Sequence, residues 1–259
     1  MSTNLKRRTK IVEIIDKNGS ITIADLLKEI DASTMTIHRD LNALEQEGLL
    51  MKTHGGAVSI SNRDFIPSFQ PRLLMHREEK QAIALEALNF ISDYDTLIID
   101  SSTTCLELAK AINNSKFSHL SVITNGHYII SEFLKSPNIS VISTGGELRR
   151  DFWAYIGTVT INSFQQIPAS KAFISSLAVS INYGITEISS DLLYKKAIIE
   201  KGQEVILLVD SSKLGKVAPI HIANLSSISK IITDEGISDE YIEKFKETGI
   251  EVIIAKVKK

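Results

Sequence analysis

The sequence predicts an α/β protein in which a small helical N-terminal domain precedes a larger domain built on a mostly parallel sheet. Two observations support this fold class. Residues 3–58 have the pattern of three helices followed by a short hairpin. Residues 77–255 instead alternate apolar runs of strand length with helical segments, which is typical of a parallel sheet covered by helices. The length of 259 residues fits two ordinary domains or one large one.

The domain boundaries follow from the change of pattern near residue 60. We expect an N-terminal domain at 1–60 and a second domain at 77–259. The segment 61–76 carries Pro67 and Pro71 and few apolar residues in register, so we expect it to be a linker.

Composition limits the class of protein. Hydrophobic residues make up 43% and charged residues 23%, which excludes a disordered or fibrous chain. The net charge of −2 does not indicate nucleic acid, but a local basic patch is sufficient to bind it. A single cysteine, Cys105, excludes an intrachain disulfide. The N-terminus leads into no long apolar run, so we expect a soluble cytoplasmic protein without membrane contact.

The N-terminal domain shows the periodicity of short helices joined by a tight turn. Thr22 is the expected N-cap of a second helix, and Ser33 the expected N-cap of a third. Ile37, Leu41 and Leu44 follow at a spacing that directs them to the core. The opposite face of the third helix is polar and basic, with Thr34, Thr36, His38, Arg39 and Asn42. This pattern predicts a helix-turn-helix whose second helix enters the major groove of DNA.

A wing follows this motif. Residues 49–54 read as a strand, Gly55-Gly56 as a two-residue turn, and 57–60 as the returning strand. The wing and the basic start of the first helix are expected to contact phosphates, which supply affinity rather than specificity. The expected DNA-binding residues are Arg7, Arg8, Ser33, Thr34, Thr36, His38, Arg39, Lys52 and His54. The alternative on periodicity alone is a generic three-helix bundle with a solvated basic face.

The segment ASTMTIHRDLNALEQEGLLMKTHGGA resembles the DeoR family of bacterial transcriptional regulators, over Lys10 to Ala57. The matching positions are Ser33, Thr36, Ile37, Arg39, Asp40, Leu41, Leu44, Glu45, Gly48, Leu49 and His54-Gly55-Gly56-Ala57. His38 departs from the family, where arginine is usual. Because histidine cannot hold guanine bidentately as arginine does, this departure leaves the base preference at this position open.

The second domain is expected to contain seven buried strands and six helices. The strands are expected at 96–100, 120–124, 139–144, 171–176, 204–210, 230–234 and 251–255. The helices are expected near 77–92, 103–113, 127–136, 157–165, 190–201 and 238–247. Similarity to the family continues through short motifs, among them Asp100-Ser101-Ser102-Thr103-Thr104, Thr124-Asn125-Gly126, Thr144-Gly145-Gly146 and Asp210-Ser211-Ser212-Lys213. The resemblance implies a sensor domain that is similar to ribose-5-phosphate isomerase and binds a phosphorylated sugar.

The residues themselves are consistent with a phosphate site. Hydroxyl residues follow Asp100 at the expected start of a helix, where backbone N–H groups attract anions. Two further small polar loops follow neighbouring strands, so three loops are expected to converge beyond the carboxyl ends of the sheet. The expected effector-binding residues are Asp100, Ser101, Ser102, Thr103, Thr104, Thr124, Asn125, Gly126, Gly145, Gly146, Arg149 and Lys213. The simpler reading is that these residues are helix caps and turns.

Catalysis is not expected. A sugar-phosphate isomerase needs a carboxylate base, and the loop 175–182 contains no acid. The six histidines lack metal-ligand spacing, and Cys105 lies in an apolar helical pattern typical of buried filler. Trp153 and Tyr155 are expected either to stack on a sugar or to pack in an interface. We therefore expect no cofactor and no metal.

The expected function is a transcriptional regulator, a repressor of a carbohydrate operon, whose partners are operator DNA, a sugar phosphate and further copies of itself. A two-fold operator requires at least a dimer. Two alternatives remain open: a sugar-phosphate enzyme with an appended DNA-binding domain, and a DNA-binding oligomer that takes no small ligand.

Overall fold

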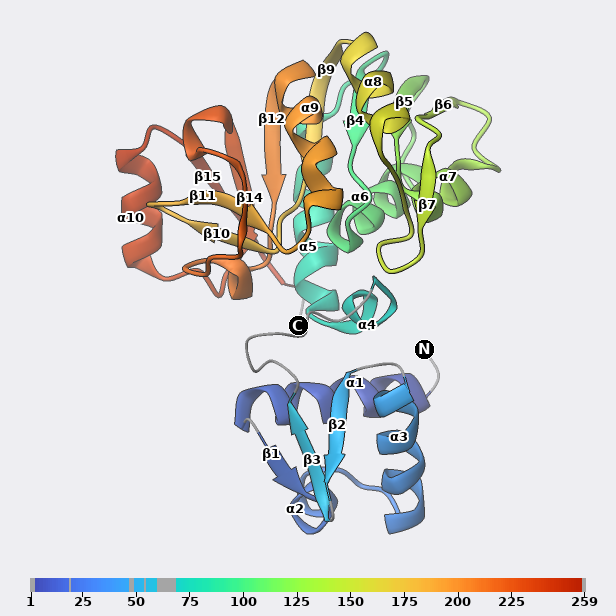
Figure 1. Cartoon of the computed structure of the whole chain (residues 1–259), viewed down its shortest axis with the longest axis vertical. Helices are drawn as coiled ribbons and strands as arrows, with labels where there is room; N and C mark the ends of the chain where they lie inside the picture. Colours follow the sequence, from blue (N-terminus) through green and yellow to red (C-terminus); the bar gives the residue numbers. More distant parts are fainter. Residues whose placement is uncertain (1–2, 19, 47–48, 54, 60–68, 258–259) are drawn as a thin grey trace. The chain divides into compact units, whose positions relative to one another are not determined.

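The computed structural model describes residues 3–18, 20–46, 49–53, 55–59 and 69–257 (Figure 1). The chain divides into two compact units, Met1–Met75 and His76–Lys259. We describe each unit by itself.

The first unit contains the predicted three helices and hairpin, together with a short strand that was not predicted. Its elements are α1 (Thr3–Asn18), β1 (Ser20–Thr22), α2 (Ile23–Glu29), α3 (Thr34–Gln46), β2 (Leu50–Thr53) and β3 (Gly56–Ser59). The three strands form one antiparallel sheet in the order β1-β3-β2. The core includes Ile11, Ile37, Leu41 and Leu44, each 0% exposed. The winged helix-turn-helix prediction is therefore confirmed.

The position of the wing turn was predicted wrongly. Thr53 pairs with Gly56, so Gly56 belongs to β3 and the turn does not lie at Gly55-Gly56. A Cβ atom on Gly56 would overlap the carbonyl oxygen of Ile21. Gly56 is thus required by the close approach of β1, rather than by a turn conformation.

The segment expected as a linker, 61–76, contains the short helix α4 (Phe69–Leu74). Pro71 is its third residue, in the first turn, where a missing N–H is tolerated. Phe69 is only 2% exposed, so this part of the segment is packed rather than extended in solvent.

The second unit is built on a seven-stranded sheet in the order β15-β14-β12-β9-β4-β5-β6, and every pairing in it is parallel. All seven predicted strands are present, as β4 (Thr96–Ile99), β5 (Leu120–Thr124), β6 (Ile139–Ser143), β9 (Ala169–Ile174), β12 (Gly202–Leu208), β14 (Lys230–Asp234) and β15 (Glu251–Ala255). The helices are α5 (Arg77–Ala87), α6 (Thr103–Asn113), α7 (His127–Phe133), α8 (Thr158–Gln166), α9 (Tyr194–Lys201) and α10 (Asp239–Glu247). Four short 3-10 helices accompany them in the described residues, η1 (Leu88–Phe90), η2 (Ser190–Leu193), η3 (Ser211–Lys213) and η4 (Leu225–Ser227).

Two small antiparallel sheets were not predicted. One is the hairpin of β7 (Glu147–Arg149) and β8 (Ala154–Ile156). The other joins β10 (Ala178–Ser180), β11 (Gly184–Glu187) and β13 (Ile220–Ala223). These strands are three or four residues long, too short for a clear apolar pattern.

The strand order reverses at the centre of the large sheet. From β4 the chain adds β5 and β6 on one side, and β9, β12, β14 and β15 lie on the other. In open α/β sheets a crevice forms at such a switch point, beyond the carboxyl ends of the strands. The candidate ligand site therefore belongs at the ends of β4 and β9. No helix in the described part of the chain is long and apolar enough to cross a membrane.

Candidate nucleic-acid interface and ligand site

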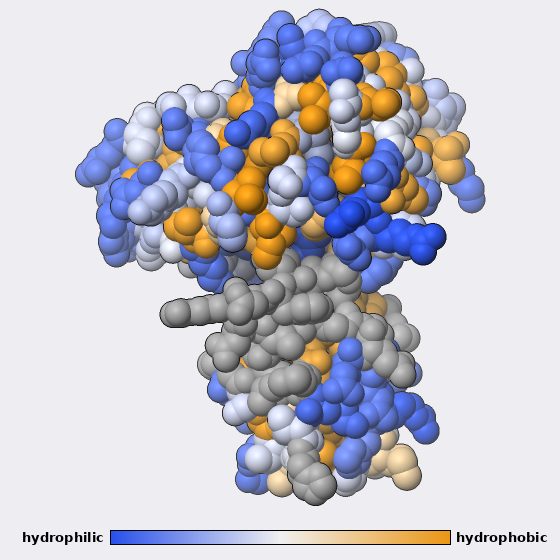
Figure 2. Space-filling view, viewed as in Figure 1, coloured by the Kyte–Doolittle hydropathy of each residue, from blue (hydrophilic) through white to orange (hydrophobic). Residues whose placement is uncertain are grey.

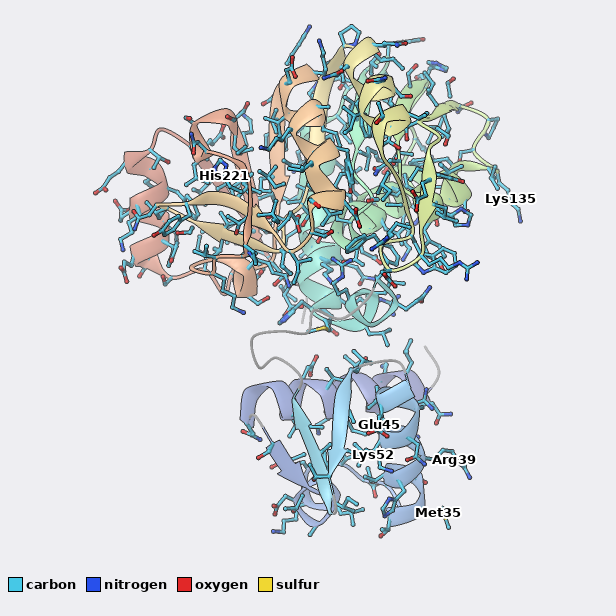
Figure 3. The ribbon with its side chains drawn as sticks, in the orientation of Figure 1. Met35, Arg39, Glu45, Lys52, Lys135 and His221 are labelled. Atoms are coloured by element: carbon cyan, nitrogen blue, oxygen red, sulfur yellow. The ribbon has the colours of Figure 1, made fainter. Side chains whose placement is uncertain are left out.

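Helix α3 separates a buried face from a polar exposed face. Thr34, Met35, His38, Arg39 and Asn42 are all exposed, on the side away from the buried residues Ile37, Leu41 and Leu44. Figure 2 shows hydrophilic residues gathered over the part of the first unit where α3 lies. Figure 3 shows Arg39 and Met35 pointing away from the domain. This face has the character of a helix that reads base edges.

Two of the predicted DNA-binding residues form the cap of α3. The Thr36 N–H donates to Ser33 Oγ at 3.3 Å, and the two side-chain hydroxyls lie 2.9 Å apart. Ser33 therefore ends the turn and starts the helix, as the sequence predicts.

Arg7 and Arg8 are held by an acidic residue inside the unit. Arg7 Nε lies 2.5 Å from one carboxylate oxygen of Asp40, and Arg8 Nε lies 3.0 Å from the other. Asp40 is only 1% exposed. These arginines join α1 to α3, and less of their charge is left for a DNA phosphate than the sequence pattern indicates. Their contact with DNA remains a prediction.

Lys52 on the wing is connected to α3. Its ammonium donates to the side-chain oxygen of Asn42, and its backbone N–H donates to Glu45 Oε1 at 2.8 Å. The wing strand β2 and helix α3 are thus joined by these bonds; Lys52 and Glu45 are labelled in Figure 3. His54, also predicted to contact DNA, lies outside the described residues.

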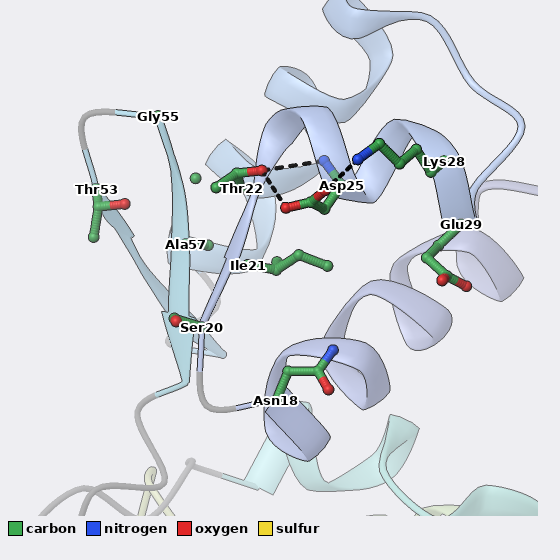
Figure 4. A pocket seen from close by; sticks show the side chains of 11 residues that line it. Asn18, Ser20, Ile21, Thr22, Asp25, Lys28, Glu29, Thr53, Gly55 and Ala57 are labelled. Atoms are coloured by element: carbon green, nitrogen blue, oxygen red, sulfur yellow. Dashed lines mark hydrogen bonds and ion pairs between the residues drawn. The ribbon is translucent and has the colours of Figure 1, made fainter.

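An open pocket of about 890 Å³ lies between α2, β1 and the wing (Figure 4). Thr22 Oγ1 caps α2 by accepting from the Asp25 N–H, and Lys28 Nζ lies 2.7 Å from Asp25 Oδ1. The hydrogen bond from Lys28 lowers the pKa of Asp25 below its usual value. Because Lys28 is paired with Asp25 and Glu29 adds a carboxylate, this pocket is a poor site for a phosphate.

In the second unit, Asp100 connects the two strands at the switch point. It follows β4, and it accepts from the Ser102 N–H and the Ser175 N–H, each at 2.9 Å. Ser175 follows β9. Asp100 is 0% exposed, so its charge must be balanced within the protein.

Lys195 provides part of that balance, because it is shared between Asp100 and a second carboxylate, Glu187. Its Nζ lies 3.3 Å from Asp100 Oδ2, forms an ion pair with Glu187, and donates to the Ser175 carbonyl at 2.6 Å. Burial opposes the charged ammonium, but the carboxylates of Glu187 and Asp100 outweigh it and raise the pKa of Lys195 above its usual value. Lys195 and Glu187 are thus a charged pair in a buried cluster.

Neither Lys195 nor Glu187 was predicted to belong to this site. The loop 175–182 lacks an acid, as the sequence shows, but β10 and β11 pair antiparallel and bring the chain back. The Ser176 hydroxyl donates to the Thr186 carbonyl at 2.9 Å, which places Glu187 beside the end of β9. The eight-residue spacing between Glu187 and Lys195 gave no signal, because the short strand β11 went unrecognised.

A second buried polar group lies next to the charged cluster. Ser101 Oγ and the Tyr194 hydroxyl are 2.7 Å apart, and Tyr194 stacks on Phe164. Burial raises the pKa of Tyr194 to about 12, although the charge of Lys195 and, to a smaller extent, Ser101 and Asn125 act to lower it. Asn125 is 0% exposed, and its Nδ2 donates to the Tyr155 carbonyl at 2.9 Å. Its Oδ1 is buried and has no hydrogen-bond partner.

The predicted loops do come together. A Cβ atom on Gly126 would lie 3.1 Å from Ser101 Cα, so the first and second loops are in close contact. The Thr144 N–H donates to the Thr124 carbonyl at 3.1 Å and joins the third loop to the second. Gly146, with φ +115°, has no room for a Cβ atom beside Ile156 O and Thr160 Oγ1. Gly146 therefore has a structural reason to be glycine.

The first loop is partly occupied by its own side chains. Ser102 Oγ accepts from the Cys105 N–H at 3.1 Å and caps α6, which begins at Thr103 as predicted. Thr103 and Thr104 are 5% and 3% exposed. Asp100 accepts from the N–H groups of Ser102 and Ser175, and Ser102 Oγ accepts from that of Cys105. Neither side chain therefore occupies the backbone N–H of Thr103 or Thr104.

The two predicted cations lie in different surroundings. Arg149 Nη2 lies 3.2 Å from Asp191 Oδ2 and connects the β7–β8 hairpin to η2. Lys213 lies near the buried carboxyl of Asp210. Burial raises the pKa of Asp210, but the charges of Lys213 and His76 outweigh burial and hold this pKa below its usual value.

Trp153 packs against His127 and Tyr128, with ring centroids 5.5 and 4.9 Å away.

The described residues give little support for a metal site or for a reactive thiol. They contain no group of three or more histidine, cysteine or acidic side chains able to hold a metal ion. Cys105 is buried, and burial raises its pKa well above the usual value, so the thiolate is disfavoured.

Two family models match the chain. The DeoR-like helix-turn-helix domain matches residues 7–63, and the DeoR C terminal sensor domain matches residues 75–235. Similar curated proteins include the HTH-type transcriptional regulator GolR of Listeria innocua, 34% identical over 97% of this chain and 98% of that protein. The lactose phosphotransferase system repressor of Lactococcus lactis is 33% identical over 94% of this chain and 96% of that protein. Among solved structures, ribose 5-phosphate isomerase A of Methanocaldococcus jannaschii is similar over 54% of this chain and 55% of that one, with 14% identity and a TM-score of 0.39.

Proposed function

We propose that this chain, which belongs to the DeoR family of DNA-binding transcriptional regulators, represses genes of carbohydrate uptake or breakdown. A phosphorylated sugar would control this repression. Two similar proteins are named as repressors of the lactose phosphotransferase system and, putatively, of the aga operon. Their names support the carbohydrate part of the proposal. The protein would act in the cytoplasm, where its operator is.

The DNA-binding role is assigned to the exposed face of α3 and to Lys52. Arg39 and His38 are exposed there, and they are suited to base edges in the major groove. Arg39→Ala should weaken specific binding by about 1–3 kcal/mol and relax base choice. A two-fold operator would be bound by a homodimer or a higher oligomer.

The ligand site is assigned to the ends of β4, β5 and β9. The observation that supports it most strongly is Asn125 Oδ1, a fully buried acceptor without a partner, next to the hydroxyls of Tyr194 and Ser101. A buried unsatisfied acceptor costs about 1–3 kcal/mol, so a ligand hydroxyl that donates to it is favoured. Sugars supply such hydroxyls.

The phosphate would bind at the first turn of α6. The N–H groups of Thr103 and Thr104 and the positive end of the helix favour an anion there. Asp100 is nearby, but it is paired with Lys195, which it shares with Glu187, so its carboxylate repels an anion less than an unpaired one would. Arg149 and Lys213 would add positive charge at the rim.

Control of DNA binding would follow from linkage. A sugar phosphate that binds the DNA-competent and the incompetent state with different affinities shifts the population between them. The same residues are compatible with release or with tighter binding.

The test is the response of DNA binding to a sugar phosphate in Asn125→Leu, which at similar size removes the unpaired acceptor together with the Nδ2 hydrogen bond to the Tyr155 carbonyl. We expect DNA affinity without ligand to be unchanged, while the response to the active sugar phosphate is lost. Asn162→Leu, at an exposed position of α8, is the control and should respond as the wild type does. A normal response of Asn125→Leu would place the ligand elsewhere.

Isomerase chemistry is the second candidate, because the structure brings Glu187 to the site. Its carboxylate is held in a buried ion pair with Lys195, so Glu187 is not available as a free base. We propose that the chain is not an enzyme. Turnover of pentose or hexose phosphates by the purified protein, lost in Glu187→Gln, would contradict this.

A further inference from the structure

Met35 is an exposed apolar side chain on an otherwise polar helix face. It is 71% exposed, and among the large hydrophobic residues described in the first unit it is the one that is exposed. The core residues of the same helix, Ile37, Leu41 and Leu44, are 0% exposed. Met35 therefore contributes nothing to the core, and its apolar surface gains free energy only if something covers it.

The position of Met35 indicates what covers it. It is the second residue of α3, and Arg39 follows one turn later on the same outward side (Figure 3). In helix-turn-helix proteins the N-terminal residues of this helix meet base edges in the major groove. The first two turns of α3 expose Thr34, His38 and Arg39 beside Met35, with no exposed carboxylate. The surroundings of Met35 thus suit DNA rather than a basic protein surface.

One apolar group is available on the base edges of the major groove, the C5-methyl of thymine. We propose that Met35 contacts a thymine methyl in each half-site of the operator and so selects T at one position. This inference rests on the assignment of α3 as the base-reading helix. The unbranched, flexible methionine side chain can adapt to the methyl group without a fixed hydrogen-bond geometry.

The position of that thymine relative to the base bound by Arg39 also follows. Four helical residues span about 6 Å along the helix axis, and base pairs are stacked about 3.4 Å apart. The thymine should therefore lie within about two base pairs of the base that Arg39 contacts.

The experiment compares thymine with deoxyuridine, which pairs identically but lacks the methyl group. A binding site is first selected from random duplex DNA with the full wild-type chain, and each T is then replaced singly by deoxyuridine. One position per half-site should lose affinity about fourfold, the value for removing one buried methyl group. In Met35→Ala the ratio of the affinity for the thymine site to the affinity for the deoxyuridine site should fall to about one at this position. The same ratio at all other positions should stay as in the wild type.

Three further variants make the test specific. Met35→Leu keeps an apolar side chain and should keep the discrimination, whereas Met35→Gln, of similar length but polar, should lose it. Leu134→Ala removes a comparably exposed apolar residue, 76% exposed in the second unit, and should change nothing. Because Met35 is exposed, its substitution should leave the urea midpoint unchanged.

Specific binding with no T-to-U effect at any position would overturn the Met35 assignment and leave the DNA-binding role intact. A wild-type ratio in Met35→Ala would overturn the assignment in the same way. Failure to select any DNA sequence would overturn the base-reading role of α3 and the Met35 assignment with it.

Discussion

Arg7 Nε of α1 lies 2.5 Å from Asp40 Oδ2 of α3, and the carboxylate between these helices is 1% exposed. Arg8 binds the second oxygen of the same carboxylate at 3.0 Å. Helix α3 is therefore oriented by this part-buried ion pair as well as by its apolar face. The DNA-binding role that we propose for α3 would depend on this orientation, because its exposed residues would have to meet the groove together.

Asp40→Asn should destabilise the first unit by about 1–3 kcal/mol, because it weakens the charge-assisted hydrogen bonds that the partly exposed Arg7 and Arg8 donate to this carboxylate. Asp31→Asn, at an exposed position before α3, should have little effect. Urea denaturation of both variants measures the difference. Equal stability of the two variants would mean that the buried pair does not hold α3.

Gly56→Ala should disrupt the wing. The new Cβ atom would overlap the Ile21 carbonyl oxygen, so β1 and β3 must separate, at a cost of about 1–3 kcal/mol. The neighbouring Gly55→Ala is a matched control, because a Cβ atom there meets nothing within 4 Å. Unfolding midpoints and DNA affinity should both fall for Gly56→Ala only. If both variants behave alike, the close approach is not limiting.

Lys195→Met should destabilise the second unit by about 3–5 kcal/mol, because it leaves the buried carboxylates of Asp100 and Glu187 without a counter-charge. Lys196→Met, at the exposed position next to it, serves as the control and should stay within about 0.5 kcal/mol of the wild type. Calorimetry of the full chain distinguishes the two. A wild-type transition in Lys195→Met would show that the cluster tolerates the loss of its cation.

His76 should make stability depend on pH. Its Nδ1 lies 4.0 Å from Glu79 Oε1, and the interaction with this carboxylate raises the pKa of His76, against burial and Lys213, with help from Asp210. Because the folded pKa lies above the unfolded value of about 6.5, the stabilisation is complete below that pH and is lost as pH rises through the folded pKa.

His76→Asn isolates this contribution. Asparagine tolerates the left-handed backbone that His76 adopts at φ 50°, so the fold is kept while the titrating group is removed. The urea midpoint of the wild type should fall more between about pH 6 and pH 8 than that of the variant. Parallel pH profiles would assign no stabilising role to the charged His76.

Most of the fold was predictable, because long apolar runs and helical periodicity report burial directly. The helix 103–113 and the strand 230–234 were predicted with the observed bounds. The short strands β10 and β11 were missed, since three or four residues carry too little periodicity. The position of Glu187 depended on those strands, and so it was missed with them.

The candidate site was only partly predictable. The hydroxyl loop at Ser101 and the loop at Asn125 were found because polar residues directly follow buried strands. Lys195 was not found, because a lysine in an amphipathic helix has the same local pattern whether it faces solvent or a buried carboxylate. Its partner Asp100 is 95 positions away in the sequence, and only the sheet order brings them together.

Control of DNA binding by a sugar phosphate is tested most directly by the fluorescence anisotropy of labelled DNA from the upstream region of the protein's own gene, with and without a panel of sugar phosphates. We expect salt-sensitive binding that one sugar phosphate releases or tightens, and that neither the free sugar nor inorganic phosphate reproduces. Tight binding that no compound in the panel changes would contradict control by a sugar phosphate, and would favour a DNA-binding oligomer without a small ligand.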